Sequence, residues 1–456
     1  MMGRRFWSAA TKPARSPLLE ERCLIQNHRT EARKAVSPLR RVAALQDKLA
    51  ILADDLTGAC DTGAMFAQRS FATVVVMNPR ARLPSDAHIV VLSTNSRNDS
   101  LQRAKAKVRQ ACLRLHTANF RVLYKKIDST LKGNIAAEIV AILQTAGFAR
   151  AVVCPAFPEQ GRVVRRGVLY VRGQCFGELS PCLEALGRFG IAPLPRPIST
   201  AKFAQAMRGT ARCVIADAET DGDLRCLVKA AGLSSTPVLL VGSAGLARHL
   251  ADALLKASRN EVMGKEARTA MAATKPAFRS VPRRQGWPRS RGERSVRSHR
   301  VLIFAGSRNA VTESQIDRLV QRQRAIIHSI AHLGPLTPLA YVARDRPVVF
   351  RVPMHQMPIE KLQRRLASLV PLFARPHFGS LVLLGGDTAL LICHWLRVKA
   401  IALRGEIAPG IPWGHFMGGK ADGVLVCTKA GGFGDANTLI RVVDFLSKPP
   451  SASPTP

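Results

Sequence analysis

Residues 49–59 read LAILADDLTGA, and this stretch decides the fold of the chain. The apolar run Leu49–Leu52 predicts a short buried strand, and two adjacent carboxylates, Asp54 and Asp55, stand where that strand should end. Gly58 then lets the chain turn into a helix. The two carboxylates point to opposite sides if the strand persists, so that one can face a pocket while the other turns inward or caps the helix. Strand ends that lead into helices are where open α/β sheets bind ligands.

Length and composition limit the classes of protein to consider. The chain has 456 residues, 47% of them hydrophobic, which is enough for two domains with real cores. No stretch approaches the roughly 20 apolar residues that cross a bilayer, and the basic N-terminus lacks the apolar run of a secretory signal. Ten cysteines form no CxxC pair and no Cys/His cluster with zinc spacing. We expect a cytoplasmic protein with reduced thiols, no membrane partner and no metal-binding residues; its oligomeric state stays open, a homodimer being one option.

The formal net charge of +37 would attract polyanions. Part of it is concentrated in two segments: residues 1–48 carry 11 Lys and Arg against 4 Asp and Glu, and residues 259–300 carry 12 against 3. Both are rich in Arg, Ser and Pro without an apolar period, which is typical of disorder. Aromatic residues are not interleaved with the basic ones, as a single-strand binding surface would need. A polyanion-binding protein is one interpretation, but a specific nucleic-acid partner is not expected.

Apolar runs alternate with helix-like stretches from residue 49 onward. This rhythm predicts an α/β fold of two domains, each a mainly parallel sheet layered with helices, with the active site in the cleft between them. The expected segments are a basic disordered extension at 1–48, a first domain at 49–257, a basic disordered linker at 258–299, a second domain at 300–447 and a frayed tail at 448–456. The expected helices include 63–69, 101–117 and 134–146. The expected strands include 49–53, 72–77, 88–93, 122–127, 151–154, 213–216, 238–241, 301–305, 325–330, 380–384, 399–403 and 423–427.

Further polar turns follow strands of the first half. The turn KKIDSTLKGN at 125–134 brings cations to a helix start, which suits an anionic ligand; the structural alternative is an N-cap at Asp128 or Ser129 with solvated lysines. Arg97 also follows a strand and can grip a carboxylate through two parallel hydrogen bonds, although an arginine in this position is often simply solvated. The loop PAFPEQGR at 155–162 either completes a site or is a structural turn.

Three glycine-rich turns follow predicted strands of the second half, at 305–308, 384–389 and 428–434. Their glycines let backbone amides approach phosphate oxygens, and Thr388 can add a hydroxyl. Together they suggest a cradle for nucleotide phosphates. The stretch GHFMGGKA at 414–421 is not a true P-loop. Ala421 stands where the motif requires a Mg²⁺-binding hydroxyl. No Rossmann GxGxxG, GxSxG elbow or HExxH helix supports nicotinamide or hydrolase chemistry.

Together these segments resemble the four-carbon acid sugar kinase family, the ATP-dependent kinases of D-threonate, D-erythronate and 3-oxotetronate. The matching pieces occur in the family's order and span about 49–445. They are ADDLTGA (53–59), KIDSTLKGN (126–134), PAFPEQGR (155–162), VIADAETDGDL (214–224), GSAGLA (242–247), GSRNAVT (306–312), GGDT (385–388), GEIAPGIP (405–412) and KAGGFG (429–434).

The resemblance implies a first domain that holds the sugar acid and a second that holds ATP, with ATP and Mg²⁺ as cofactors and phosphoryl transfer across the cleft. It implies that Asp54 or Asp55 is the catalytic carboxylate. The residues implied for substrate binding are Asp55, Arg97, Lys126, Ile127, Asp128, Ser129 and Lys132. The residues implied for ATP binding are Ser307, Gly385, Gly386, Asp387, Thr388, Gly431 and Gly432.

The residue chemistry agrees with this reading. Arg97 and Lys126 can neutralise the carboxylate of a tetronate, while Asp54 or Asp55 orients the terminal hydroxyl and accepts its proton. Phosphoryl transfer depends mostly on positioning and charge stabilisation. The chain departs from the family at Lys132, where the family typically has Arg, and in the shortness of residues 307–385. A catalytically degenerate nucleotide or sugar-acid binder is therefore the alternative to an active kinase.

Overall fold

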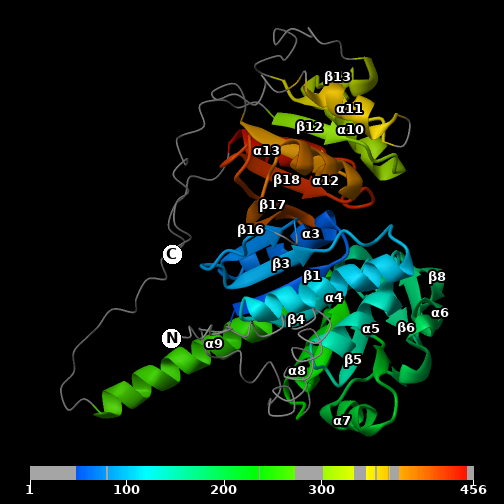
Figure 1. Cartoon of the computed structure of the whole chain (residues 1–456), viewed down its shortest axis with the longest axis vertical. Helices are drawn as coiled ribbons and strands as arrows, with labels where there is room; N and C mark the ends of the chain where they lie inside the picture. The colour runs from blue at the N-terminus through cyan, green and yellow to red at the C-terminus, as the bar shows by residue number, and fades with distance from the viewer. Residues whose placement is uncertain are drawn as a thin grey trace, which may run out of the picture.

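The computed structural model describes residues 48–78, 81–235, 237–272, 301–332, 346–354, 357–367, 369 and 379–448 (Figure 1). The N-terminal extension expected up to residue 48 lies almost wholly outside this part of the chain. So do most of the expected linker, from residue 273 on, and the tail from residue 449.

Eight parallel strands from the first half of the chain form one side of the main sheet. Their spatial order is β2-β3-β1-β4-β11-β5-β10-β9. Most are fully buried apolar runs, as expected for a parallel sheet covered on both faces. Their bounds are β1 Lys48–Ala53, β2 Thr73–Val76, β3 Ile89–Ser93, β4 Phe120–Lys126, β5 Arg150–Cys154, β9 Ile191–Leu194, β10 Cys213–Ala216 and β11 Val238–Gly242.

Helices cover both faces of this half. One group contains α4 and α5, which pack against each other, and the other contains α3, α8 and α9 (Figure 1). The bounds are α3 Leu56–Ala67, α4 Leu101–Thr117, α5 Ile135–Thr145, α6 Leu179–Leu183, α7 Thr200–Arg208, α8 Asp221–Gly232 and α9 Ala244–Ala272. A separate antiparallel sheet lies beside them, with strands β6 Arg162–Arg165, β7 Val168–Val171 and β8 Gln174–Glu178.

The second half repeats the architecture with five parallel strands in the order β13-β14-β12-β15-β18. Their bounds are β12 Val301–Ala305, β13 Ile326–Ser329, β14 Val348–Arg351, β15 Ser380–Leu384 and β18 Leu425–Lys429. The helices are α10 Ala310–Gln323, α11 Ile359–Ala367, α12 Gly386–Trp395 and α13 Thr438–Ser447.

An antiparallel hairpin joins the two halves. Strand β16 (Ala400–Ala408) pairs with β2 of the first half, and β17 (Ile411–Met417) pairs with β18 of the second. The result is one sheet of fifteen strands, with α3 lying near the junction (Figure 1). The predicted α/β fold is confirmed, but the sheets of the two halves meet edge to edge. The sequence did not reveal this, because the strand predicted at 399–403 carries no sign of its pairing partner.

One predicted helix boundary differs, and one helix extends into a segment that was expected to be disordered. Helix α3 begins at Leu56 rather than residue 63, because the extended residue Asp55 caps it: its side chain accepts a hydrogen bond from the Gly58 amide. Helix α9 continues to Ala272 through the first part of the segment expected to be a disordered linker. That part contains Ala, Glu, Lys, Arg and Met, which favour helix, and no proline before Pro276. Within the described residues, no helix is both long and apolar enough to cross a membrane.

Candidate active site

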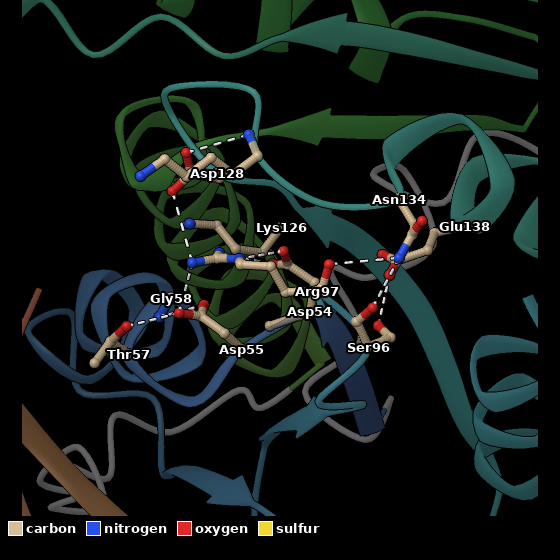
Figure 2. A network of polar contacts seen from close by, with 12 residues as sticks. Asp54, Asp55, Thr57, Gly58, Ser96, Arg97, Lys126, Asp128, Asn134 and Glu138 are labelled. Atoms are coloured by element: carbon tan, nitrogen blue, oxygen red, sulfur yellow. Dashed lines mark hydrogen bonds and ion pairs between the residues drawn. The ribbon is translucent and has the colours of Figure 1, made fainter. Parts of the chain in front are cut away.

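The carboxyl ends of β1, β3 and β4 place the predicted acid-binding residues together. These strands are parallel neighbours in the order β3-β1-β4, so the segments that follow them meet at one edge of the sheet. Asp54 and Asp55 follow β1, Arg97 follows β3, and Lys126 ends β4. Figure 2 shows their side chains gathered in one polar network.

Arg97 lies at the centre of this network. Its Nε is 2.7 Å from Asp54 Oδ2 and its Nη2 is 3.1 Å from Asp54 Oδ1, so the guanidinium grips that carboxylate at both oxygens. Its Nη1 donates to Asp55 Oδ2 at 2.8 Å and lies 3.8 Å from Asp128 Oδ1 (Figure 2). Arg97 is therefore not simply solvated: it holds two buried carboxylates side by side.

These surroundings shift the pKa values of the two carboxylates in opposite directions. Burial raises the pKa of Asp54, but the positive charges of Arg97 and Lys125 outweigh it, and the pKa is lowered from its ordinary value. At Asp55, burial outweighs the Arg97 charge, and the neighbouring Asp54 charge adds to it, so the pKa is raised. Both oxygens of Asp55 also accept hydrogen bonds from its own helix start, from the Gly58 amide and the Thr57 hydroxyl.

The loop that carries Arg97 is fixed by buried polar contacts. Ser96 donates its amide to Asp54 O at 3.0 Å, and its hydroxyl donates to Glu138 Oε1 at 2.5 Å. Glu138 pairs in turn with Lys125, and Asn134 Nδ2 donates to the Ser96 carbonyl at 2.9 Å (Figure 2). Helix α5 thus supports the position of Arg97.

The predicted turn at 126–132 divides into residues that face the pocket and residues that do not. Lys126, Asp128 and Ser129 line a small pocket beside Asp55. Asp128 Oδ2 accepts hydrogen bonds from the amide and hydroxyl of Thr130, and its pKa is lowered because Arg97 and Lys126 outweigh its burial. The side chain of Ile127 packs in the hydrophobic core, and Lys132 is exposed and does not line this pocket.

The three glycine-rich turns of the second half also converge. Strands β12, β15 and β18 are parallel neighbours, so the turns after them share one edge of the sheet. A β-carbon built on Gly431 would lie 2.5 Å from Ser307 Oγ, and one on Gly385 would lie 3.4 Å from Ser307 Cβ. Gly385, with φ of +99°, precedes the first turn of α12, where Thr388 is buried and Asp387 is exposed. Gly432 continues the Gly431 turn toward Asn309.

The two groups of residues meet at the start of α12. A β-carbon built on Gly386 would lie 3.1 Å from Asp55 Oδ2 and 3.3 Å from Thr57 Oγ1. The glycine turn thus lies against the Asp55 carboxylate without an intervening side chain. The pocket beside Asp55 is likewise lined from both halves. Its lining residues are Asp55, Thr57, Gly58, Asp61, Arg97, Lys126, Asp128, Ser129, Phe157, Ser243, Gly410, Pro412, Thr428, Ala430 and Phe433.

Comparison with known proteins identifies the family. Residues 49–180 and 188–250 match the model of a sugar-binding N-terminal domain, and residues 330–439 match that of a nucleotide-binding C-terminal domain. A D-threonate kinase of Bordetella bronchiseptica is 30% identical over 416 residues, which cover 87% of this chain and 97% of that protein. The chain belongs to the four-carbon acid sugar kinase family. It is accordingly an ATP-dependent kinase.

Other relatives also match the kinase over most of its length. A D-erythronate kinase of Heliobacterium modesticaldum is 25% identical and covers 87% of the chain and 96% of its own length. A 3-oxo-tetronate kinase of Pectobacterium atrosepticum is 24% identical, with coverages of 86% and 98%. A crystal structure of a Haemophilus influenzae protein superposes with a TM-score of 0.60 at 19% identity and covers 87% of the kinase and all of that protein. This last likeness shows the shared fold.

Sequence reasoning missed several pocket residues of the kinase. Asp61 is the most notable, because it adds a third carboxylate to the lining. It lies four residues after Thr57, which places both on one face of α3, and this spacing was the available signal. Gly410 comes from the β16–β17 turn, Pro412 from β17, and Phe157 from the 155–162 loop. Both segments matched the family pattern without a role for these residues.

Proposed function

We propose that the kinase transfers the γ-phosphoryl group of ATP to the C4 hydroxyl of a four-carbon sugar acid such as D-threonate, D-erythronate or 3-oxotetronate. The observation that carries this proposal is the approach of Gly386 to Asp55. It brings the start of α12, which we propose binds phosphate, against side chains that we propose bind the acid. The relatives' activities support the choice of a four-carbon acid.

The first half, proposed as a unit over 49–257, would hold the acid. The cations of Lys126 and Arg97 and the hydroxyl of Ser129 border the pocket and suit a carboxylate. Because Arg97 already pairs with Asp54 and Asp55, it also fixes the position of both. We assign these two carboxylates to the alignment of the acceptor hydroxyl next to the phosphate turn.

The second half, proposed over 300–447, would hold ATP. Amides at the N-terminus of α12 and of the Gly431 turn can donate to phosphate oxygens, and the helix dipole favours their negative charge. Ser307 and the buried Thr388 add hydroxyls close to these turns. Mg²⁺, when bound, neutralises phosphate charge, and it takes mainly phosphate and water oxygens with one or two carboxylates. The exposed carboxylate of Asp387, beside the turn, is a donor of this kind.

We also propose that the reaction takes place in the cytoplasm. The nine cysteines within the described residues are all free, and six of the thiols are buried with raised pKa values; burial raises the pKa of Cys60 and that of Cys154 to about 12. Free thiols are maintained in the reducing cytosol.

The test is an ADP-release assay with Mg·ATP on the full chain. The panel is D-threonate, D-erythronate, L-threonate, 3-oxotetronate and glycerate. We expect clear turnover on one or more of the four-carbon acids and none on glycerate. Phosphorus–carbon coupling in the NMR spectrum of the product should place the phosphate on C4. Silence on the whole panel, with ATP binding intact by calorimetry, would instead support a non-catalytic binder. Phosphate on another oxygen would overturn the assignment of C4.

A further inference from the structure

Asp61 presents a buried oxygen without a partner in the pocket. It lies on α3, on the face that Thr57 and Gly58 also turn to the pocket, and the residue is only 6% exposed. Within the described part of the chain, its Oδ1 makes no hydrogen bond. Burying an unpaired carboxylate oxygen costs free energy. Such an atom is explained most simply by a ligand that donates to it.

The other carboxylates of the site are engaged. Asp54 has both oxygens on Arg97. Asp55 accepts from Gly58 at Oδ1 and from Thr57 and Arg97 at Oδ2. Asp128 Oδ2 accepts from Thr130, and its Oδ1 faces Arg97. A hydroxyl that approached any of these would compete with donors already in place. Among the carboxylates that line the described pocket, Asp61 alone has a fully buried oxygen without a hydrogen-bond partner.

We propose that Asp61 accepts the proton of the acceptor hydroxyl during phosphoryl transfer, which rests on the proposed function above. The hydroxyl oxygen forms a bond to the γ-phosphorus of ATP as its O–H bond breaks and the proton passes to Asp61 Oδ1. The bond from the γ-phosphorus to its bridging oxygen breaks, and ADP leaves with that electron pair. Asp61 then releases the proton to solvent. Asp61 comes from the first half of the chain and Thr428 from the second, and both line the pocket. This carboxylate therefore lies where the two halves meet.

The surroundings of Asp61 suit this role. Burial is the main cause that raises its pKa to about 6, so at neutral pH it is ionised yet more basic than an ordinary aspartate. Lys126, Arg162 and Arg248 oppose the rise, and Asp55 adds to it. Glu406 on β16 also faces this carboxylate, and its own pKa is raised to about 8, mainly by burial and then by the Asp61 charge. The charged and titratable groups around Asp61 are therefore Asp55, Cys60, Tyr124, Lys126, Arg162, Arg248 and Glu406.

The test compares Asp61→Asn with the wild type on the acid that gives the highest turnover. Asparagine keeps the size and a hydrogen-bond acceptor but loses the basicity. We expect kcat to fall by about 10²- to 10⁴-fold, with the KM values for ATP and the acid changed by less than about threefold. The matched control is Thr62→Val, because Thr62 is the next residue of α3, is fully buried and has an unpaired hydroxyl within the described chain. It should retain wild-type kcat.

The pH profile supplies a readout that a structural role would not move. Wild-type kcat/KM should fall about tenfold per pH unit below about pH 6. This acidic limb, the decline in kcat/KM below about pH 6, should persist in the Asp55→Asn variant at lower activity. It should vanish in the Asp61→Asn variant. An Asp61→Asn enzyme that keeps both its kcat and the limb would overturn the assignment, as would a flat wild-type profile between pH 5 and 8. If the wild type is active and the Asp61→Asn variant has unimpaired kcat, only this assignment is overturned. A wild type that is silent on all acids overturns the proposed function and this assignment with it.

Discussion

Lys125 Nζ lies 2.5 Å from Glu138 Oε2, and both side chains are almost completely buried. This ion pair connects β4 to α5 below the loop that carries Arg97, since Glu138 also accepts the Ser96 hydroxyl. Lys125 Nζ donates in addition to the Lys126 carbonyl at 2.8 Å. The site therefore rests on a charged contact inside the core rather than on apolar packing alone.

Removal of one partner of this pair should destabilise the kinase strongly. Lys125→Met leaves the Glu138 carboxylate buried without its cation, and we expect the free energy of unfolding to fall by about 3–5 kcal/mol. Lys125→Met combined with Glu138→Leu should recover part of that loss, because no uncompensated charge remains. Urea unfolding followed by circular dichroism measures both. The control is Lys107→Met, whose partly exposed pair with Asp99 should cost about 1 kcal/mol or less. Equal losses at positions 125 and 107 would contradict this interpretation.

Gly386 should not tolerate a side chain. Gly386→Ala places a β-carbon 3.1 Å from Asp55 Oδ2, so the carboxylate or the turn must shift. Because misplacement by about 1 Å can cost about 100-fold in rate, we expect kcat to fall by at least tenfold while the unfolding temperature changes by a few degrees at most. Gly177→Ala on β8 serves as the control, since a β-carbon there meets nothing within 4 Å. Steady-state kinetics with unchanged kcat in Gly386→Ala would rule out the close apposition of the two turns.

Lys429 should shape the nucleotide turn without contacting the nucleotide. Its buried Nζ donates to the carbonyls of Ala430, Gly431 and Phe433 at 3.1–3.3 Å. Burial lowers its pKa to about 8. Lys429→Met leaves these carbonyls without their donor, so we expect the KM for ATP to rise at least tenfold while the KM for the acid changes little. Lys420→Met, at an exposed position, is the control. A lower unfolding temperature with an unchanged KM for ATP would show that Lys429 supports the fold only.

Much of the fold could be predicted, because the strands of a doubly covered sheet are continuous apolar runs. The ranges 213–216, 301–305 and 380–384 match β10, β12 and β15 at both ends. The small sheet β6–β8 was missed: its strands contain Arg, Gly and Gln, and they pair with each other through tight turns rather than bury an apolar face on both sides. The pairing of β16 with β2 depends on contacts between distant segments, which no local pattern encodes.

The site was predictable to the extent that it follows strand order. Asp55 and Arg97 follow parallel strands and Lys126 ends one, so their convergence follows from the α/β architecture. Their pairing does not: the sequence suggested that Arg97 waits for a ligand carboxylate, whereas it already binds two aspartates. Lys132 carries charge in the same motif but lies outside the pocket. The importance of Asp61 depends on its burial, which a periodicity argument cannot measure.

Asp61 should also cost the folded kinase stability at neutral pH. Its pKa is raised from 3.8 to about 6 in the folded state, so the native protein binds the proton more tightly than the unfolded chain does. Stability must therefore fall as pH rises from about 4 to about 6, and the full penalty applies above pH 6. A shift of this size corresponds to roughly 3 kcal/mol. Asp61→Asn removes the charge and should raise the unfolding temperature much more at pH 8 than at pH 4.5. Thermal unfolding of both proteins across this range measures the difference, and an equal effect at both pH values would mean that Asp61 titrates normally.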